Sequence, residues 1–301
     1  MNILNFKNLR MRSKLLTLCL LVSIPPLAVT SFMANMKAKE ALELATAQAS
    51  DALRSQASDA MASVRDLKAS RIESYFTTIR DQILTFSEDR MIVDAMRDMP
   101  ALFDAYYEQR EIDADQLGQM RRDLGSYYSK DFTDAYKDSN EGKNPSALQY
   151  LDQLSDTAIA LQHAYIHANP QALGAKDGMD AADDGSEYSK RHREFHPAVR
   201  SYLHKFGYYD IFLCDPNSGN IVYSVFKEVD YATSLKTGPY AKTNIGKAYL
   251  KASKASTSET FAFVDFEQYT PSYEAPASFI ASPIYDGHEK LGVVIFQMPL
   301  D

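Results

Sequence analysis

Residues 207–228 read Gly-Tyr-Tyr-Asp-Ile-Phe-Leu-Cys-Asp-Pro-Asn-Ser-Gly-Asn-Ile-Val-Tyr-Ser-Val-Phe-Lys-Glu, and this stretch decides the fold. Two runs rich in β-branched and aromatic residues, 208–214 and 221–226, flank a turn set at 215–219. Such runs around Asp, Pro, Asn, Ser and Gly predict a β-hairpin. Neither run alternates between polar and apolar residues, so we expect both faces of the sheet to be covered.

Three more strand-like runs follow the hairpin, at 261–266, 277–284 and 291–298. The last two are joined by Asp286-Gly287, which is typical of a tight turn. A helical pattern at 244–253 separates the hairpin from these runs. The order β-β-helix-β-β-β predicts a five-stranded antiparallel sheet with the helix on one face, in an α+β fold.

The N-terminus carries a candidate transmembrane helix at 15–36, a segment without a charged residue. About 20 apolar residues are needed to cross a bilayer as a helix. Four basic residues precede the segment, Lys7, Arg10, Arg12 and Lys14. Under the positive-inside rule they place residues 1–14 in the cytoplasm and everything after 37 outside.

A cleaved signal peptide is the alternative reading of this segment. Its apolar core would be shorter and would end in a small-x-small site. Residues 28–30 (Ala-Val-Thr) and 34–36 (Ala-Asn-Met) match such a site poorly, so we favour an uncleaved membrane helix.

Residues 37–86 contain neither Pro nor Gly and are rich in good helix formers, which predicts one long helix. At 1.5 Å per residue it forms a rod of about 75 Å. An apolar seam follows its second half, at Ile72, Phe76, Ile79, Ile83 and Phe86. The seam suits either a second subunit, giving a homodimer, or packing within the same subunit.

Further helices are predicted at 90–137, 148–168 and 192–206. We expect interruptions near Pro100 and Gly118 in the first of these helices and at Pro197 in the last. Together these segments predict a helical region before the sheet.

Composition excludes several classes of function. With 40 acidic and 32 basic residues the chain is acidic, and we find no basic stripe interleaved with aromatics, so nucleic acid is not an expected partner. Cys19 lies in the apolar segment and Cys214 in a predicted strand, so we expect no disulfide, and Cys214 should be a buried apolar side chain. The Gly-x-Ser-x-Gly, Gly-x-x-x-x-Gly-Lys and Gly-x-Gly-x-x-Gly motifs are absent from the sequence, so we expect neither an enzyme nor a bound cofactor.

Two segments resemble metal sites only in part. His163 and His167 are four residues apart on a predicted helix, but they do not form His-Glu-x-x-His and no third ligand is obvious. Residues 177–187 resemble a calcium loop in composition, yet with Asp180 as the first loop position Ala182 and Arg191 fall where oxygen ligands are needed. We therefore expect no metal and a solvated acidic loop.

Several stretches resemble the bacterial Cache-type sensor regions, which are PAS-like extracytoplasmic modules of methyl-accepting chemotaxis proteins. The stretches are Gly-Tyr-Tyr-Asp-Ile-Phe-Leu (207–213), Ile-Val-Tyr-Ser-Val-Phe-Lys-Glu (221–228), Thr-Pro-Ser-Tyr-Glu-Ala-Pro-Ala-Ser-Phe-Ile-Ala (270–281), Val-Ile-Phe-Gln-Met-Pro (294–299), and, upstream, 159–170 and 192–197. The resemblance covers residues 148–301.

The resemblance implies a transmembrane receptor, usually dimeric, in the bacterial inner membrane. It divides the chain into a cytoplasmic N-terminus (1–14), a membrane helix (15–36), a periplasmic helical region (37–190) and a Cache module (191–301), the first of a pair. Similar regions also head histidine kinases and nucleotide cyclases, so the output stays open. A membrane-anchored structural or adhesion module without a small-molecule ligand is the second reading.

A pocket for a small polar solute is expected between the sheet and its crossing loops. Tyrosine combines an apolar body with a polar tip, and a nearby carboxylate can hold an amine. The predicted lining residues are Tyr208, Asp210, Tyr223, Lys227, Asp230, Tyr231, Asp265, Tyr269 and Tyr273. The amino-acid motif of the family, Arg-x-Trp-Tyr, does not occur, and the chain contains no Trp, which argues against amino-acid recognition of that type.

Overall fold

The structure, a computed structural model, describes residues 10–299, and Lys7 of the predicted basic cluster lies outside them. The chain divides into two compact units, Met1–Ser74 and Tyr75–Asp301. The expected boundary between residues 190 and 191 therefore falls inside the second unit, because the helical region and the sheet share one core.

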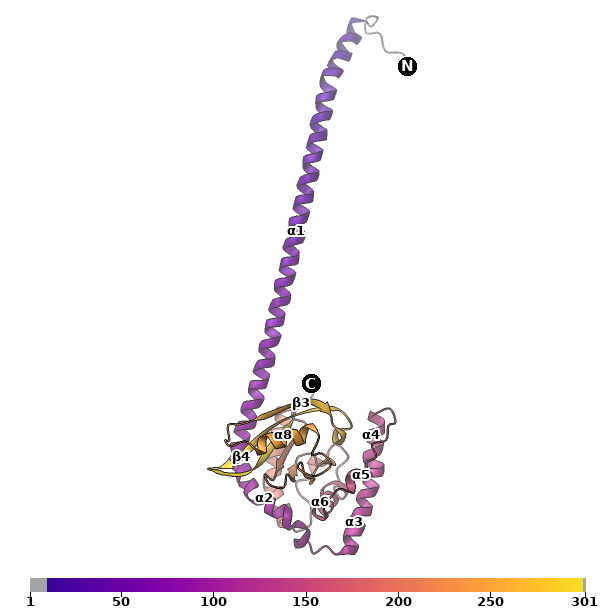
Figure 1. Ribbon diagram of the computed structural model, residues 1–301. Coiled ribbons are helices and arrows are strands. Elements are labelled where there is room, and N and C mark those ends of the chain that lie inside the picture. The colour runs from indigo at the N-terminus through magenta and orange to yellow at the C-terminus, as the bar shows by residue number, and fades with distance from the viewer. Residues whose placement is uncertain (1–9, 300–301) are drawn as a thin grey trace. The chain divides into compact units, whose positions relative to one another are not determined.

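The described part of the first unit is helical and belongs to α1 (Met11–Glu88). The predicted long helix is confirmed, and it begins before residue 37 (Figure 1). Its N-terminal part is long and apolar enough to cross a membrane, and none of that stretch is buried within the protein. An apolar helix with nothing packed against it fits a lipid environment better than water.

The second unit begins with the last turns of α1 and continues through helices that surround a sheet. These are α2 (Arg90–Gln109), α3 (Ala114–Tyr127), the π-turn η2 (Tyr128–Phe132), α4 (Thr133–Ser139), α5 (Leu148–Leu151), α6 (Asp156–Gln162), the π-turn η3 (His163–His167), the 3₁₀ turn η4 (Lys176–Gly178), α7 (Glu187–Phe206), α8 (Asn244–Ser253) and the 3₁₀ turn η5 (Thr270–Ser272). Figure 1 shows α3 and α4 following one another end to end, next to α5 and α6.

The predicted α+β fold with its antiparallel sheet is confirmed. Within the described residues the five strands are β1 (Asp210–Cys214), β2 (Ile221–Ser224), β3 (Ala262–Gln268), β4 (Pro276–Asp286) and β5 (Glu289–Gln297). Their order is β2-β1-β5-β4-β3, with every neighbouring pair antiparallel.

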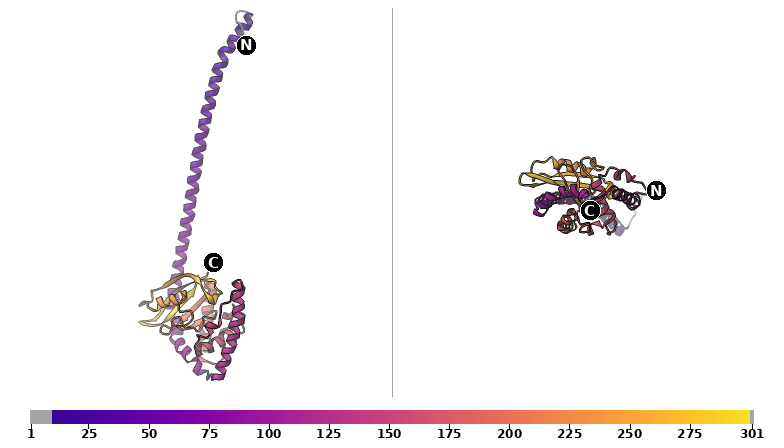
Figure 2. Two further views of the ribbon diagram at one scale, coloured as in Figure 1. Left: turned by 45° about the vertical axis from the view of Figure 1, so that its right-hand side comes forward. Right: turned by 90° about the horizontal axis from the view of Figure 1, so that it is seen from below.

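Both faces of the sheet are covered, as the lack of alternation predicts. On one face Gly292 of β5 lies against Met96 of α2, and Phe296 packs on Phe86 of α1 with ring centroids 5.2 Å apart. α8 covers the other face, so that Figure 2 shows helix, sheet and helix as three layers of the second unit. Buried β-branched and aromatic residues fill both interfaces.

The two predicted turns are present. Asp215 begins the β1–β2 turn, and its carboxylate accepts the backbone N–H groups of Asn217 and Ser218. Gly219 ends the turn at φ 73°, and Gly287 in the β4–β5 turn has φ 61°. Glycine adopts positive φ without the steric cost of a Cβ, which explains why these turns contain it.

Helix interruptions differ from the predicted ones. Pro100 and Pro197 lie inside continuous helices, and Gly118 lies inside α3, so these three expectations were wrong. The chain instead breaks at 110–113, where the Asp113 capping box starts α3, and at 152–155, where Ser155 caps α6. Burial of α2 and α7 along their lengths outweighs the loss of one backbone hydrogen bond at each proline.

Two helical glycines provide a matched test of this packing. A Cβ at Gly246 of α8 would lie 2.8 Å from the carbonyl oxygen of Tyr240 and closer still to that of Ala241, whereas at Gly118 of α3 it would meet only the end of a flexible arginine. We predict that Gly246→Ala lowers the free energy of unfolding by about 1–3 kcal/mol through overpacking. Gly118→Ala should raise it by about 0.5–1 kcal/mol through helix propensity. Urea denaturation measures both, and equal effects would contradict the close approach at α8.

Candidate ligand-binding site

The predicted pocket residues are distributed over several places in the second unit. Tyr208 and Tyr223 contact the α7 side of the sheet, where Tyr208 packs on Phe296 and Tyr223 packs on Phe195. On the α8 side, Tyr269 packs on Phe279 (5.2 Å between ring centroids). Tyr231 contacts Tyr188 of α7, and Asp265 lies on the edge strand β3.

Lys227 lies at the centre of this region and is almost completely buried. Its ammonium donates to the carbonyl oxygens of Ser224 (2.8 Å) and Val225 (3.1 Å) and lies 5.1 Å from the ring centre of Tyr223. Its backbone has φ 56°, a conformation that costs a non-glycine residue about 1–3 kcal/mol. Burial lowers the pKa of Lys227.

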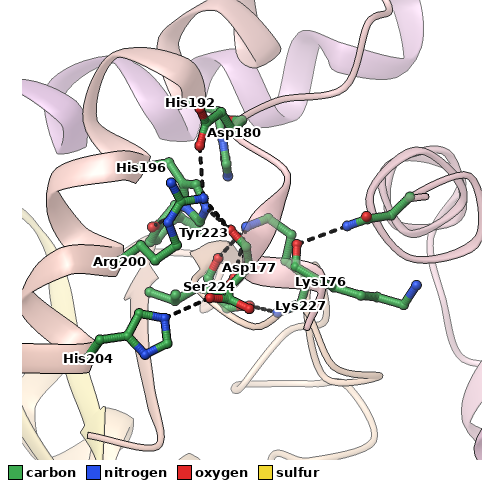
Figure 3. Close-up of polar contacts among 12 residues, drawn as sticks. Lys176, Asp177, Asp180, His192, His196, Arg200, His204, Tyr223, Ser224 and Lys227 are labelled. Carbon is green, nitrogen blue, oxygen red and sulfur yellow. Dashed lines mark hydrogen bonds and ion pairs between the residues drawn. The ribbon is translucent and has the colours of Figure 1, made fainter. Parts of the chain in front are cut away.

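One face of α7 forms hydrogen bonds to the loop that contains Asp177 and Asp180, as Figure 3 shows. His192, His196, Arg200 and His204 follow one another at intervals of four residues. Their partners are the carbonyl oxygen of Asp180 for His192, the carbonyl oxygen of Asp177 for His196 and Arg200, and the carboxylate of Asp177 for His204 (2.6–2.8 Å). Arg200 also pairs with the Asp180 carboxylate at 2.9 Å.

The acidic loop at 177–187 is solvated only in part: Asp180, Asp183 and Glu187 are exposed as its composition predicts, whereas its other two acidic residues are held by the protein. Asp177 is buried, and the Asp184 carboxylate accepts the hydroxyl of Tyr106 at 2.6 Å. A composition rich in Asp predicts solvent exposure only when no basic or hydroxyl partners face the loop, and α7 and α2 supply them.

His196 is held as a neutral imidazole. Its Nε2 donates to the carbonyl oxygen of Asp177, so Nδ1 is the acceptor for the Tyr223 hydroxyl at 2.7 Å. Burial, followed by the positive charge of Lys227, lowers the pKa of His196 to about 2. The pKa of the neighbouring His192 is also well below its usual value because of burial and Lys227.

Asp210 at the start of β1 is fully buried under the loop that follows β2. Its Oδ1 accepts the backbone N–H groups of Ile211 (2.6 Å), Val225 (2.9 Å) and Phe226 (3.3 Å), while Oδ2 has no hydrogen-bond partner among the described residues. Burial raises the pKa of Asp210, and the charge of Asp230 raises it further.

Asp230 and Glu228 lie in the same loop. Asp230 is fully buried, its Oδ2 accepts the Tyr269 hydroxyl, and its Oδ1 has no partner in the part of the chain that is described. Burial raises the pKa of Asp230 to about 6. Glu228 is half-buried and accepts the hydroxyls of Tyr209 (3.3 Å) and Ser272 (3.2 Å). Burial, with the charges of Asp230 and Asp210, raises the pKa of Glu228.

A groove of about 510 Å³ opens over Glu228, between the end of α7, the start of β1 and the end of β5. This volume lies in the range of small-molecule sites. Its principal side chains are Tyr208, Tyr209, Phe226, Glu228, Ser272 and Gln297. Gln297 is buried and donates to Ser272 at 3.1 Å, while its Oε1 is unpartnered among residues 10–299.

The structure brings only part of the predicted set to this groove. Tyr208 lines it, and Asp210 and Asp230 influence the carboxyl group of Glu228 within it. Tyr273 borders an adjoining cavity of about 20 Å³ with Lys227 and Glu228.

The other predicted residues serve elsewhere. Tyr231 shares a hydrogen bond with Tyr188 (2.7 Å between the hydroxyl oxygens) in the helical core. Tyr223 pairs with His196, and Tyr269 faces Asp230. Asp265 is exposed on the edge strand β3 and has no place in the groove.

Sequence reasoning missed Tyr209, Phe226, Glu228, Ser272 and Gln297. All of them fall in the stretches quoted for the Cache resemblance, which was the available signal. Their convergence depends on pairing β1 with β5, a contact between residues about 80 positions apart that no local pattern contains.

Comparison with known proteins leaves the family open. No family model matches the chain, and no curated protein matches it. A solved structure with some similarity is the sensor domain of the V. cholerae histidine kinase DctB, at 15% identity and a TM-score of 0.28. The match covers 62% of this chain and 56% of that chain, and a similarity of this level does not identify a function.

The neutral histidines of α7 predict a pH dependence of stability. The pKa of His196 is depressed in the folded state, whereas the unfolded chain binds the proton near pH 6.5, so unfolding takes up a proton and stability falls as the pH drops below about 6.5. Each such group contributes about 1.4 kcal/mol per pH unit.

We predict that His196→Gln, which keeps a donor for Asp177, flattens the plot of unfolding free energy against pH between 6 and 5 by about one proton. The buried carboxyls of Asp210 and Asp230 act with the opposite sign but are common to both proteins, so they cancel in the comparison. Urea titrations across this range measure the slopes. Equal slopes in the two proteins would show that His196 is not held neutral.

Proposed function

We propose that the protein is the extracytoplasmic input region of a transmembrane signalling receptor and that it binds a small solute with a positively charged group. The observation that carries this proposal is the groove over the half-buried Glu228, whose pKa the charges of the buried Asp230 and Asp210 raise. The Cache resemblance of residues 148–301 supports the same role.

The charge balance of the groove favours a cation. The charge of Asp230 adds to burial in raising the pKa of Asp210 and Glu228, and Asp210 raises that of Glu228 further. Burying charged carboxylates without partners is costly. An ammonium group entering the groove would supply the missing counter-charge to Glu228. Tyr209 and Phe226 offer aromatic rings whose faces attract cations.

A direct contact links the groove to α1. Tyr208 lines the groove, and its hydroxyl donates to Oε1 of Gln82 in α1 at 2.5 Å. A ligand that closes the loop containing Glu228 over the groove would shift Tyr208 and, through Gln82, the helix that leads to the membrane. Receptors use such small displacements of packed helices as signals.

We favour a chemoreceptor in the bacterial inner membrane, with the residues after 37 on the outer side of that membrane. The sensor region of a histidine kinase or a nucleotide cyclase is the alternative, because such receptors carry similar ligand-binding regions. A structural or adhesion module is the second reading, and it predicts an empty groove.

A homodimer fits the surface of the first unit. Several large apolar side chains between residues 37 and 74 are exposed on α1, among them Leu42, Leu53, Met61, Val64, Leu67 and Ile72. A second copy of α1 would cover such side chains, as in two-stranded coiled coils.

The ligand prediction is tested by thermal shift of the full chain in detergent against primary and quaternary amines, with neutral and carboxylate analogues beside them. A ligand at 100 times its dissociation constant stabilises by about 2.7 kcal/mol. We expect amines alone to raise the melting temperature and Glu228→Gln to weaken binding at least tenfold, because it keeps the shape and removes the charge. Glu259→Gln, at an exposed glutamate, is the matched control. Amine binding that survives Glu228→Gln, or no shift with any amine, would exclude this site.

The membrane orientation is tested by cysteine labelling in intact bacterial cells. In a Cys19→Ser background, we predict that Ser50→Cys reacts with a membrane-impermeant maleimide and that Ser13→Cys reacts only after lysis. The buried Cys214 should stay unlabelled in both. Labelling of Ser13→Cys in intact cells would reverse the proposed topology.

A further inference from the structure

A second cluster of ligand-type side chains lies outside the groove, on the helical side of the second unit. Asp123 of α3 and His163 and His167 of η3 each present one ligand atom, and these atoms lie within 4.8 Å of one another. The sequence offered no third ligand for the two histidines. α3 provides it from 40 positions away, because α3 packs against α6 and η3.

Local geometry holds the three side chains together. η3 is a π-turn that continues α6, and it places the two imidazole rings in a stack with centroids 5.1 Å apart. Single π-turns are rare and occur often at functional sites. The Asp123 carboxylate is oriented by Gln119, which donates to Oδ1 at 2.7 Å, while Oδ2 lies 3.2 Å from Nε2 of His163.

We propose that Asp123, His163 and His167 bind a divalent transition-metal ion of the Zn²⁺ type. Two imidazoles and one carboxylate form a protein ligand set that Zn²⁺ uses when it keeps a position for water. Imidazole nitrogens disfavour Ca²⁺ and Mg²⁺, which require oxygen ligands. The ion replaces the present contact between Asp123 and His163, and water completes its coordination.

The cluster is accessible and suitably charged. The side chains of Asp123 and His163 are 29% and 22% exposed, and His167 is exposed, so an ion can enter from solvent without opening the core. Burial lowers the pKa of His163, which favours the neutral imidazole that a metal needs. For Asp123, burial is outweighed by hydrogen bonds from Gln119 and His163, and the pKa is lowered.

The proposed metal site adjoins Gln162, which holds the loop after β2. Gln162, directly before His163, donates to the carbonyl oxygens of Tyr231 (2.6 Å) and Val229 (3.2 Å). Tyr128 in turn donates to Gln162 at 2.8 Å. A metal that joins α3 to η3 would therefore also restrain the loop containing Glu228 and Asp230.

The site is tested by calorimetric titration of the full chain in detergent with Zn²⁺. The buffer contains a chelator of known Zn²⁺ affinity, so that the free Zn²⁺ concentration is defined. The variants are His163→Ala, His167→Ala and Asp123→Asn, and the matched control is His288→Ala at an exposed histidine outside the cluster. We expect one Zn²⁺ per chain, at least a tenfold loss of affinity in each cluster variant and wild-type affinity in the control. His167 is exposed, so its replacement leaves the fold intact.

A titration with Co²⁺ gives an independent readout, since its visible spectrum reports nitrogen and oxygen ligation. The spectrum should appear with the wild type and the control and should be lost with His167→Ala. Absence of Zn²⁺ binding below 1 mM, or unchanged affinity in the His163 and His167 variants, overturns the proposal. These outcomes do not depend on amine binding in the groove over Glu228, which is tested separately with Glu228→Gln.

Discussion

The placement of three carboxyl groups in and under one loop is the constraint on which the second unit depends. Asp210 is covered by the loop after β2 and accepts three backbone N–H groups, so it holds the start of that loop onto the sheet. Glu228 and Asp230 follow within the same loop, and the charge of Asp230 raises the pKa of both Asp210 and Glu228. A loop this acidic remains folded because hydroxyls, backbone amides and protonation replace the water that it loses.

Lys227 and α7 stabilise the opposite side of the same loop. The ammonium of Lys227 is buried beside Tyr223, and Tyr223 is hydrogen-bonded to His196 of α7. The positive φ of Lys227 shows that the backbone adopts a costly conformation to place this side chain inside. Buried charge, neutral histidine and backbone strain are therefore concentrated around Lys227 and Tyr223, next to Glu228 in the chain. Shifted pKa values of this kind are frequent at functional sites.

Much of the fold could be predicted from the sequence, whereas the site could be predicted only in part. The hairpin at 207–228 and the helix at 244–253 are visible locally, since turn residues and β-branched runs act over short distances. The breaks predicted at Pro100 and Pro197 were wrong because tertiary burial outweighed a local rule. Tyr209 and Gln297 meet only after β1 pairs with β5, and Asp123 meets His163 only after α3 packs on η3, so neither convergence has a local pattern.

The central claim is that Glu228 and Asp230, whose side-chain partners among the described residues are hydroxyl groups, lack a counter-charge until a ligand enters. A ¹³C NMR titration of labelled aspartate carboxyl carbons tests it most directly. With the signal assigned by Asp230→Asn, the account predicts that the pKa of Asp230 in the ligand-free protein is about 6, against about 3.9 for an unperturbed aspartate. An Asp230 pKa at or below the unperturbed value would mean that the carboxylate is already compensated. The proposed cation site over Glu228 would then lose its physical basis.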